Sequence, residues 1–279
     1  MTWTFTDDVD RFLATAGPSL SARPAESTVL LTVTAALRRH GPHAYGDHDP
    51  VLGWWRGADG EVAGTLLHTP PYPATLNAVA PEAIAPLMAA RRLTRVNADR
   101  ATARAVAAHW PGHRVDEEQR LYRLGELTAP SPAPGGRARA ATPADRALLL
   151  RWYAAFSADI GGPGASAGAR HGRAVDERTA EGRLTLWEDD GVPVSMAGIS
   201  LRIAGTARVA PVYTPPERRG RGYAAAVTAE VSGAARAAGA DEVLLFTDLA
   251  NPTSNGVYTR IGYRAVSDRL VISAEKSDG

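Results

Sequence analysis

The sequence of 279 residues contains no cysteine and a single lysine, Lys276. The lack of cysteine excludes disulfide bonds, thiolate-bound metals and catalysis through an acyl-cysteine. No apolar run approaches the roughly 18 residues of a membrane span, and no basic-then-apolar leader is present. The formal net charge of +1 argues against nucleic acid or another polyanion as partner. These absences predict a cytoplasmic protein with no membrane or nucleic-acid partner.

The length suits two domains of ordinary size. The clearest linker is residues 128–136, where three alternating prolines precede a pair of glycines. This composition is typical of a stiff, polar spacer. The sequence therefore predicts an N-terminal domain at 1–128, a linker at 129–136 and a C-terminal domain at 137–279.

The N-terminal half shows helical periodicity over residues 5–40 and a strand meander over 51–79. A helix from Pro81, a strand at 93–97, a helix at 101–109 and a strand at 114–124 follow. In the last strand, Val115, Leu121 and Leu124 are candidate core residues.

A loop between these helices and the meander is rich in histidine and aspartate. His40, His43 and His48 lie there, and Asp47 and Asp49 flank His48. Such a cluster could hold a metal, but in a loop it is more typical of a solvated surface. No metal site is predicted.

The C-terminal half predicts a strand at 137–140 and a helix that Thr142 caps before Pro143. A Gly-rich loop at 161–172, which includes His171, and a short helix at 174–180 follow. Strands are expected at 184–187, 192–202 and 207–213. A helix to about Ala238, a strand at 243–246 buried on both faces, a helix from Asn251 and a strand at 263–272 complete the chain.

Residues 215–225 place three arginines and two glycines between a strand and a helix. Glycines let backbone N–H groups approach a ligand, and a helix N-terminus adds partial positive charge. Arginines add full charge and forked donors. The pattern therefore predicts a pyrophosphate-binding loop, with a solvated basic turn as the alternative.

The spacing Gly220-x-Gly222-x-x-Ala225, with Asp241 about 20 residues on, also fits a dinucleotide fingerprint. However, a dinucleotide glycine follows its strand directly, whereas Pro215, Pro216 and charged residues intervene here. The acidic residue should also end a strand, but Asp241 begins one. A nicotinamide-dependent enzyme is therefore the weaker interpretation.

Read as Arg219-x-x-Gly222-x-Ala224, the loop resembles the acyl-CoA loop of the GCN5-related N-acetyltransferase (GNAT) superfamily. A second motif supports the resemblance: Asn251 and Tyr258 lie on the last helix, before Gly262-Tyr263. The order of elements from 137 to 272 is similar to the GNAT fold, and the N-terminal half looks like a degenerate copy without the arginine-glycine loop. The expected class is α/β (α+β), with two GNAT-like domains, each a mixed, mostly antiparallel sheet flanked by helices. An unrelated N-terminal α/β domain is the alternative.

The resemblance implies acetyl-CoA as the cofactor and a pantetheine arm lying between splayed strands at 212–214 and 245–248. Tyr258 is the implied general acid, with packing alone as the alternative role. The superfamily often carries an acidic base on the strand before the loop. Here that strand has none, and Asp248, Glu188 and His171 are weaker substitutes. The implied cofactor-binding residues are Val212, Tyr213, Thr214, Arg218, Arg219, Gly220, Arg221, Gly222, Tyr223, Ala224, Asn251 and Ser254.

The resemblance therefore predicts an acyltransferase that moves an acetyl group from acyl-CoA to a primary amine of a small molecule. The amine would attack the thioester directly in a ternary complex. A non-catalytic acyl-CoA-binding protein is the alternative, because the strand carboxylate is missing. The N-terminal domain would then cover or shape the acceptor site.

Overall fold

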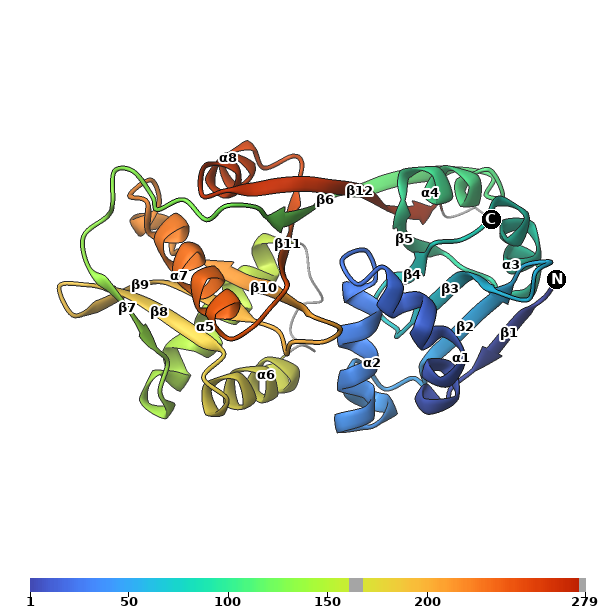
Figure 1. The fold of residues 1–279 in the computed structure, drawn as a ribbon, viewed down its shortest axis with the longest axis horizontal. Helices are drawn as coiled ribbons and strands as arrows, with labels where there is room; N and C mark the ends of the chain where they lie inside the picture. The colour runs from blue at the N-terminus through green and yellow to red at the C-terminus, as the bar shows by residue number, and fades with distance from the viewer. Residues whose placement is uncertain (161–167, 276–279) are drawn as a thin grey trace. The chain divides into compact units, whose positions relative to one another are not determined.

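The computed structural model describes residues 1–160 and 168–275. These residues form two compact units that do not follow the sequence in two simple halves. Unit 1 contains Met1–Leu121, Thr247–Ala250 and Val266–Gly279, and unit 2 contains Tyr122–Phe246 and Asn251–Ala265. Figure 1 shows the chain coloured from its N-terminus to its C-terminus. No helix in the described part of the chain combines the length and apolarity that a membrane span requires.

Unit 1 follows the order strand, two helices, three strands, helix, strand, helix, strand. Its elements are β1 (Trp3–Thr6), α1 (Val9–Ala22), α2 (Thr28–His40), η1 (Pro42–Ala44), β2 (Val51–Arg56), β3 (Val62–His68), β4 (Ala74–Asn77), η2 (Pro81–Ala83), α3 (Ile84–Ala90), β5 (Arg95–Asp99), α4 (Arg100–Ala107) and the start of β6 (His113–Leu124). The last two residues of β1, Phe5 and Thr6, were predicted to be helical, and that part of the prediction was wrong. The four residues of this strand are too few to show a period-2 pattern.

Unit 2 repeats the same order of elements. They are β7 (Arg137–Ala140), η3 (Pro143–Asp145), α5 (Arg146–Asp159), α6 (Gly168–Ala180), β8 (Leu184–Asp189), β9 (Val192–Ile199), β10 (Thr206–Tyr213), η5 (Pro216–Arg218), α7 (Tyr223–Ala237), β11 (Glu242–Asp248), α8 (Pro252–Arg260) and the start of β12 (Tyr263–Ala274). The Gly-rich loop predicted at 161–172 lies outside the described residues up to 167, and from Gly168 onward the chain is helical. His171 is therefore a helix residue.

The sheet of each unit runs in chain order through its first five strands. In unit 1 the order is β1-β2-β3-β4-β5, and in unit 2 it is β7-β8-β9-β10-β11. In each unit the fifth strand has a neighbour from the other half of the sequence. Strand β12 lies beside β5, and β6 lies beside β11. Within both units most neighbours are antiparallel, but the fourth and fifth strands pair in parallel. The predicted mixed, mostly antiparallel sheets are therefore confirmed.

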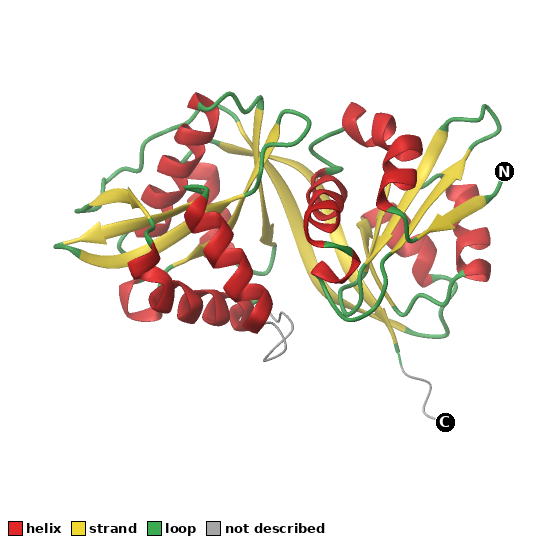
Figure 2. Ribbon diagram, turned by 90° about the horizontal axis from the view of Figure 1, so that it is seen from below, coloured by secondary structure: helices red, strands yellow, loops and turns green. Residues whose placement is uncertain are grey.

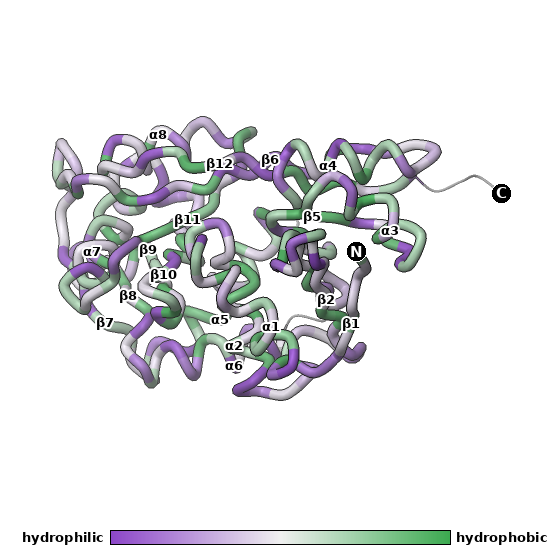
Figure 3. Tube along the Cα trace, turned by 45° about the vertical axis from the view of Figure 1, so that its right-hand side comes forward, coloured by the Kyte–Doolittle hydropathy of each residue, from purple (hydrophilic) through white to green (hydrophobic). Residues whose placement is uncertain are grey.

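Helices cover the sheets and close separate cores in the two units (Figure 2). In unit 1, Leu76, Leu87 and Val106 are fully buried in one cluster. In unit 2, Val227, Val243 and Tyr263 are fully buried in another. Figure 3 shows hydrophobic stretches along strands such as β5 and β9. Burial of such apolar surface is the main favourable contribution to folding.

Three candidate core residues of β6 can be compared with the structure. Leu121 and Leu124 are buried, whereas Val115 is 48% exposed because the first four residues of this strand lie at the surface. In β11, Val243, Leu244 and Leu245 are buried as expected. Phe246 is only half-buried.

The domain boundary expected at 129–136 differs from the division in the structure. Unit 2 begins at Tyr122, and residues from Val266 onward belong to unit 1. Tyr122 and Leu124 are buried in the same cluster as Val227 and Tyr263. A proline-rich stretch signals a local break in regular structure, but it carries no information about which sheet a later strand joins.

This division predicts the behaviour of a fragment of residues 137–279. The fragment lacks Tyr122 and Leu124, and its last strand loses β5, the strand that it pairs with. We expect it to be insoluble or to show no cooperative thermal unfolding by circular dichroism, whereas the full chain unfolds cooperatively. A soluble fragment with native helix content and a sharp transition would show that residues 137–279 fold alone, as the linker composition suggested.

Candidate active site

The parallel pairing of β10 with β11 stops before either strand ends. The register runs from Thr206 opposite Glu242 to Arg208 opposite Leu244. Strand β10 then continues to Tyr213 and β11 to Asp248. Since paired strands lie about 4.8 Å apart, the loss of register shows that the two strands diverge here. The splay expected for residues 212–214 and 245–248 is therefore present.

A β-bulge on the other side of β10 coincides with this divergence. Val209 lies opposite Ile199, but Val212 lies opposite Ala197, so β10 has one extra residue. Pro211 lies inside the bulge and has no N–H to give to a ladder. Bulges bend a strand and redirect its backbone. Val212, just after the bulge, packs against the same buried cluster as Tyr258.

The end of β10 is held by a short hydroxyl network. The Ser195 hydroxyl lies 2.8 Å from the Thr214 hydroxyl and donates to the Tyr213 carbonyl at 3.1 Å. All three residues are buried, and the Tyr213 ring packs on Trp152 at 6.0 Å between centroids. Burial raises the pKa of Tyr213, so its phenol stays neutral. This network fixes the backbone of residues 213–214, where the resemblance places a carbonyl-polarising N–H.

The turn between β10 and α7 has two glycines in the left-handed region. Gly220 has φ +77° and Gly222 has φ +83°, and Gly222 caps α7 without a side-chain hydrogen bond. The first intrahelical bond runs from the Ala226 N–H to the Gly222 carbonyl. The N–H groups of residues 223–225 precede it and have no partner within the helix. A Cβ at Gly220 would meet no protein atom within 4 Å. The N-terminus of α7 is therefore open and suited to an anion.

Arg219 supports this turn instead of projecting from it. Its Nε donates to the Thr214 carbonyl at 2.9 Å, and its terminal nitrogen pairs with Asp159 at 2.7 Å. The guanidinium also lies 5.9 Å from the centre of the Tyr213 ring. The expectation of arginine charge around the cofactor therefore applies to Arg218 and Arg221. Arg221 is exposed and Arg218 is half-buried.

The first residue of α7 is anchored to the β8–β9 hairpin. The Tyr223 hydroxyl donates to Asp189, and the side chain is 4% exposed. The hydrogen bond to Asp189 raises the pKa of Tyr223, which keeps the phenol a donor. Ala224 follows it in the first turn and is half-buried. The sequence placed both residues at the turn but gave no indication of Asp189 as a partner.

Residues 125–136 pack along unit 2, and we call this segment the strap. Its start bonds to the end of α8, through Gly125 N–H to the Gly262 carbonyl and Thr128 N–H to the Ile261 carbonyl. At its other end the Trp187 indole donates to the Gly135 carbonyl at 2.8 Å. Pro134 lies 3.7 Å from the Cβ position of Gly222. The predicted linker is therefore bonded to unit 2 at both ends and contacts the turn at Gly222, so it is not a free spacer.

Helix α8 carries the second predicted motif. The Asn251 side chain accepts the Ser254 N–H at 3.0 Å and so caps the helix that was predicted to begin here. Asn255, which the sequence interpretation missed, accepts a hydrogen bond from the Tyr122 hydroxyl at 3.0 Å. Since Tyr122 is more than a hundred residues away, no local pattern could reveal this pair. Asn251 is exposed and Ser254 half-buried, so both side chains are accessible to a ligand.

Tyr258 lies half-buried on α8, where its ring packs edge-on against Tyr263 at 6.1 Å between centroids. Tyr263 is fully buried, and its hydroxyl lies 2.8 Å from the Ser232 hydroxyl. Burial raises the pKa of Tyr258 to about 12. Tyr258 therefore stays protonated at neutral pH and can donate a hydrogen bond to a developing anion.

The three substitute bases differ in how they are engaged. Glu188 is paired with Arg139 at 2.6 Å, and Asp248 accepts the Ala250 N–H at 2.8 Å. His171 packs edge-on against Tyr153, and burial, with a smaller contribution from Arg170, lowers its pKa. The lowered pKa leaves His171 mostly neutral at pH 7, whereas Glu188 is held as an ion pair.

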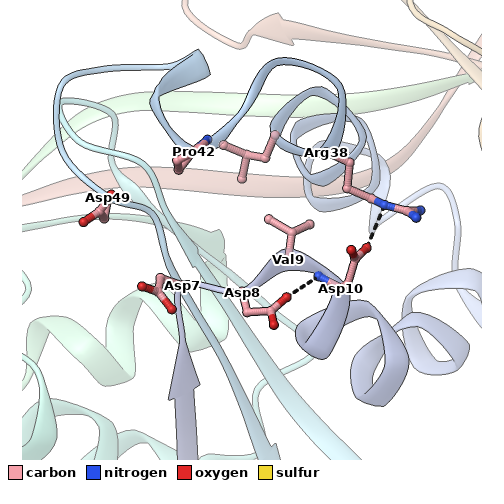
Figure 4. A pocket seen from close by; sticks show the side chains of 8 residues that line it. Asp7, Asp8, Val9, Asp10, Arg38, Pro42 and Asp49 are labelled. Atoms are coloured by element: carbon pink, nitrogen blue, oxygen red, sulfur yellow. Dashed lines mark hydrogen bonds and ion pairs between the residues drawn. The ribbon is translucent and has the colours of Figure 1, made fainter.

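A separate hollow in unit 1 is lined by acidic residues (Figure 4). Most of its carboxylates already have partners. Asp8 accepts the N–H groups of Asp10 and Arg11, and Asp10 pairs with Arg38 at 2.8 Å. Asp49 pairs with His43 at 3.0 Å. Over residues 1–160 and 168–275, no three histidine or acidic side chains are grouped so as to hold a metal.

The two units share one order of elements, each with a mixed, mostly antiparallel sheet, and this is the arrangement of two GNAT-like folds in one chain. The family model described as "Acetyltransferase (GNAT) family" matches residues 150–263. Residues 150–263 are thus a GNAT domain. No curated protein matches the sequence.

Solved structures similar to the whole chain agree with this assignment. A GNAT-family acetyltransferase from Colwellia psychrerythraea is 12% identical with a TM-score of 0.63, covering 99% of this chain and 100% of that one. A GCN5-related N-acetyltransferase from Sphaerobacter thermophilus is 17% identical with a TM-score of 0.59, covering 97% and 94%. A tandem GNAT protein from the clavulanic acid biosynthesis pathway is 17% identical with a TM-score of 0.58, covering 99% and 100%. At these identities the likeness shows the fold alone.

The dinucleotide alternative does not agree with this fold. Its fingerprint requires a parallel sheet in which an acidic residue follows the second strand. Here β10 is antiparallel to β9, and Asp241 lies between α7 and β11.

The cap on α8 gives a prediction about stability. Replacing Asn251 with Ala removes the acceptor for the Ser254 N–H, and loss of such a cap costs about 1 kcal/mol. We expect a matching fall in the free energy of unfolding, measured by urea titration. Asn251→Ser keeps a capping oxygen and should remain close to the wild type. Equal destabilisation by Ala and Ser would show that Asn251 acts through another contact.

Proposed function

We propose that the chain is an N-acetyltransferase that moves an acetyl group from acetyl-CoA to a primary amine of a small molecule. The observation that carries this proposal is the loss of register between β10 and β11, which leads directly to the glycine turn at the start of α7. An extended arm fits between diverging strands, and a pyrophosphate fits an uncapped helix N-terminus.

The residues of the turn suit the cofactor. The backbone N–H groups of residues 220–224 would hold the pyrophosphate, since both glycines adopt positive φ and Gly220 faces open space. Arg218 and Arg221 would add charge. Asn251 and Ser254, at the start of α8, are the proposed contacts to the rest of the cofactor. Acetyl-CoA supplies an acyl thioester, whose carbonyl carbon is the point of attack.

The backbone of residues 212–214 would polarise the thioester carbonyl. The bulge shifts the register of this strand, which still pairs with β9 at Val212 and Tyr213, and the Ser195 and Thr214 hydroxyls hold its end. Fixed N–H donors that meet a developing oxyanion cost no reorganisation during the reaction. Val212, Tyr213 and Thr214 are thus positioned by their strand.

Tyr258 would stabilise the sulfur as it leaves. A thiol has a pKa near 8.5 and Tyr258 one of about 12, so the phenol acts chiefly by donating a hydrogen bond to the thiolate. The proton balance is completed by the attacking amine, which loses a proton as the new amide forms. Strand β10 carries no acidic residue to deprotonate the amine. The amine would therefore bind in its neutral form, or its proton would pass to water. The same absence is the feature that favours a non-catalytic acyl-CoA-binding protein as second candidate.

The two candidates are distinguished by thiol release from acetyl-CoA in the presence of a panel of small amines. An acetyltransferase releases CoA in an amine-dependent manner. Binding without thiol release for any amine would favour the non-catalytic alternative. Absence of binding would overturn both.

Gly222→Val should separate binding from folding. Valine at φ +83° is strained and would crowd the approach of the pyrophosphate. We expect acetyl-CoA affinity by calorimetry to fall more than tenfold, or about 1.4 kcal/mol. Gly60→Val is the matched control, because Gly60 also has φ +83° and open space around its Cβ but lies in the β2–β3 turn. Equal affinity of the two variants would refute the assignment of the turn.

Tyr258→Phe should lower the rate of the chemical step and leave acetyl-CoA binding unchanged. Loss of an acid–base group typically costs about 10²–10⁴-fold, so a single-turnover rate about a hundredfold lower is expected. Because the pKa of Tyr258 is about 12, the ratio of wild-type to variant rates should stay constant up to about pH 10. Tyr263→Phe, which loses the bond to Ser232, should lose stability but keep its rate. A Tyr258→Phe rate within about twofold of the wild type would make Tyr258 a packing residue.

Trp187→Phe should test the strap. It removes the indole bond to the Gly135 carbonyl and so loosens Pro134 beside Gly222. We expect a several-fold higher KM for acetyl-CoA at unchanged single-turnover rate. Trp110→Phe is the matched control. It loses an equivalent indole bond, to the Leu93 carbonyl at 3.0 Å, but Trp110 belongs to unit 1 and is distant in sequence from the turn. If both variants lose stability and neither changes KM, the strap does not contribute to the cofactor site.

A further inference from the structure

Unit 1 contains a parallel strand pair that corresponds by order to the diverging pair of unit 2. Strands β4 and β5 pair from Ala74 opposite Val96 to Thr75 opposite Asn97. Each strand then has two further residues, ending at Asn77 and Asp99. In unit 2 the corresponding unpaired ends are longer, reaching Tyr213 and Asp248.

One buried guanidinium bridges the two strands of unit 1 at this point. Arg269 lies on β12 and is 6% exposed. A single terminal nitrogen donates to the Leu76 carbonyl of β4 at 2.9 Å and to the Asn97 carbonyl of β5 at 3.0 Å. Its Nε donates to the Asn97 side-chain oxygen at 2.8 Å. Arg269 therefore satisfies carbonyl groups on both strands at the end of their register, Asn97 in the last pair and Leu76 one residue beyond it.

This bridge leaves no room for a ligand between the strands. An extended arm inserted between two strands needs them about 9–10 Å apart, twice the usual spacing. The Arg269 nitrogen that bonds both carbonyls occupies the space between the Leu76 and Asn97 carbonyls, so an inserted arm would have to displace it. The Arg269 bridge and an inserted acyl arm are thus mutually exclusive.

The bridge is also difficult to open. Burial lowers the pKa of Arg269 to about 10, which still leaves the group charged at neutral pH. A buried charge that loses its hydrogen bonds is strongly unfavourable. The end of β4 is held further by Asn77, whose amide donates to the Ser27 hydroxyl at 3.1 Å and whose carbonyl accepts from Thr65 at 3.2 Å.

The turn that follows β4 also lacks the features of the turn at Gly222. Residues 78–80 are Ala-Val-Ala, and Ala78 has φ +50° without being glycine. The helix that follows, α3, has only seven residues. Neither a glycine pair nor a long helix faces the end of β4.

We propose that Arg269 clamps β4 to β5 and so closes unit 1 to acyl thioesters, and that the chain binds one acetyl-CoA, in unit 2. This inference rests on the proposed function for the cofactor site of unit 2. It assigns to the last strand a role besides completing the sheet of unit 1. The two units thus share an order of elements but not a binding activity.

Calorimetric titration of the full chain with acetyl-CoA tests the number of sites. We expect a stoichiometry of one per chain, with affinity more than tenfold lower in Gly222→Val. Two sites in the wild type would overturn the clamp. No binding to the wild type would instead overturn the proposed function, so the two failures are distinguishable.

The clamp is tested independently by thermal unfolding of Arg269→Lys. Lysine keeps the charge but lacks the fork that reaches both strands, so Tm should fall by about 5 °C or more. Arg95→Lys is the matched control, because Arg95 lies on β5 in a half-exposed pair with Asp116 at 3.0 Å. Equal, small shifts in the two variants would show that Arg269 does not hold the strands together. A variant that does not fold at all would agree with the clamp, provided that Arg95→Lys folds.

Discussion

The account of this protein depends on where a parallel strand pair stops pairing. Hydrogen bonds across β10 and β11 end at Arg208 and Leu244, while both strands continue. Backbone polar groups released from a ladder must find other partners or a ligand. Here the release coincides with a bulge on the opposite edge of β10, so the strand is bent at the point where it leads into the glycine turn. The strand end, the turn and the N-terminus of α7 therefore act as one element.

Unit 1 has the same order of elements, but the ends of its parallel strands are bridged by a side chain. Its parallel pair is shorter, and Arg269 supplies the hydrogen bonds that a ligand would otherwise make. At the end of the parallel pair, unit 2 has a bulge and a turn with two glycines, whereas unit 1 has a buried arginine and an alanine turn. A fold can thus be kept while a site is lost, because the sheet needs its strands and not their divergence.

Local patterns in the sequence were sufficient for the elements and the loop of unit 2. The positive φ of Gly220 and Gly222, the Asn251 cap and the buried Tyr263 all follow from short-range rules. Contacts between distant segments could not be predicted in this way. Arg219 resembles a free cation in sequence but bonds to Thr214 and Asp159, and Arg269 resembles a surface residue of an alternating strand. The pairing of β12 with β5, and the position of β6 beside β11, could not be predicted either, because the sequence of a strand does not determine which strand it pairs with.

Amide hydrogen exchange with and without acetyl-CoA is the most direct test of the central claim. The account predicts slower exchange in the segments 212–214 and 220–224 when acetyl-CoA is present, with residues 74–77 and 95–99 of unit 1 unchanged. Slower exchange confined to β4 and β5, or saturating binding that leaves residues 212–224 unchanged, would contradict it.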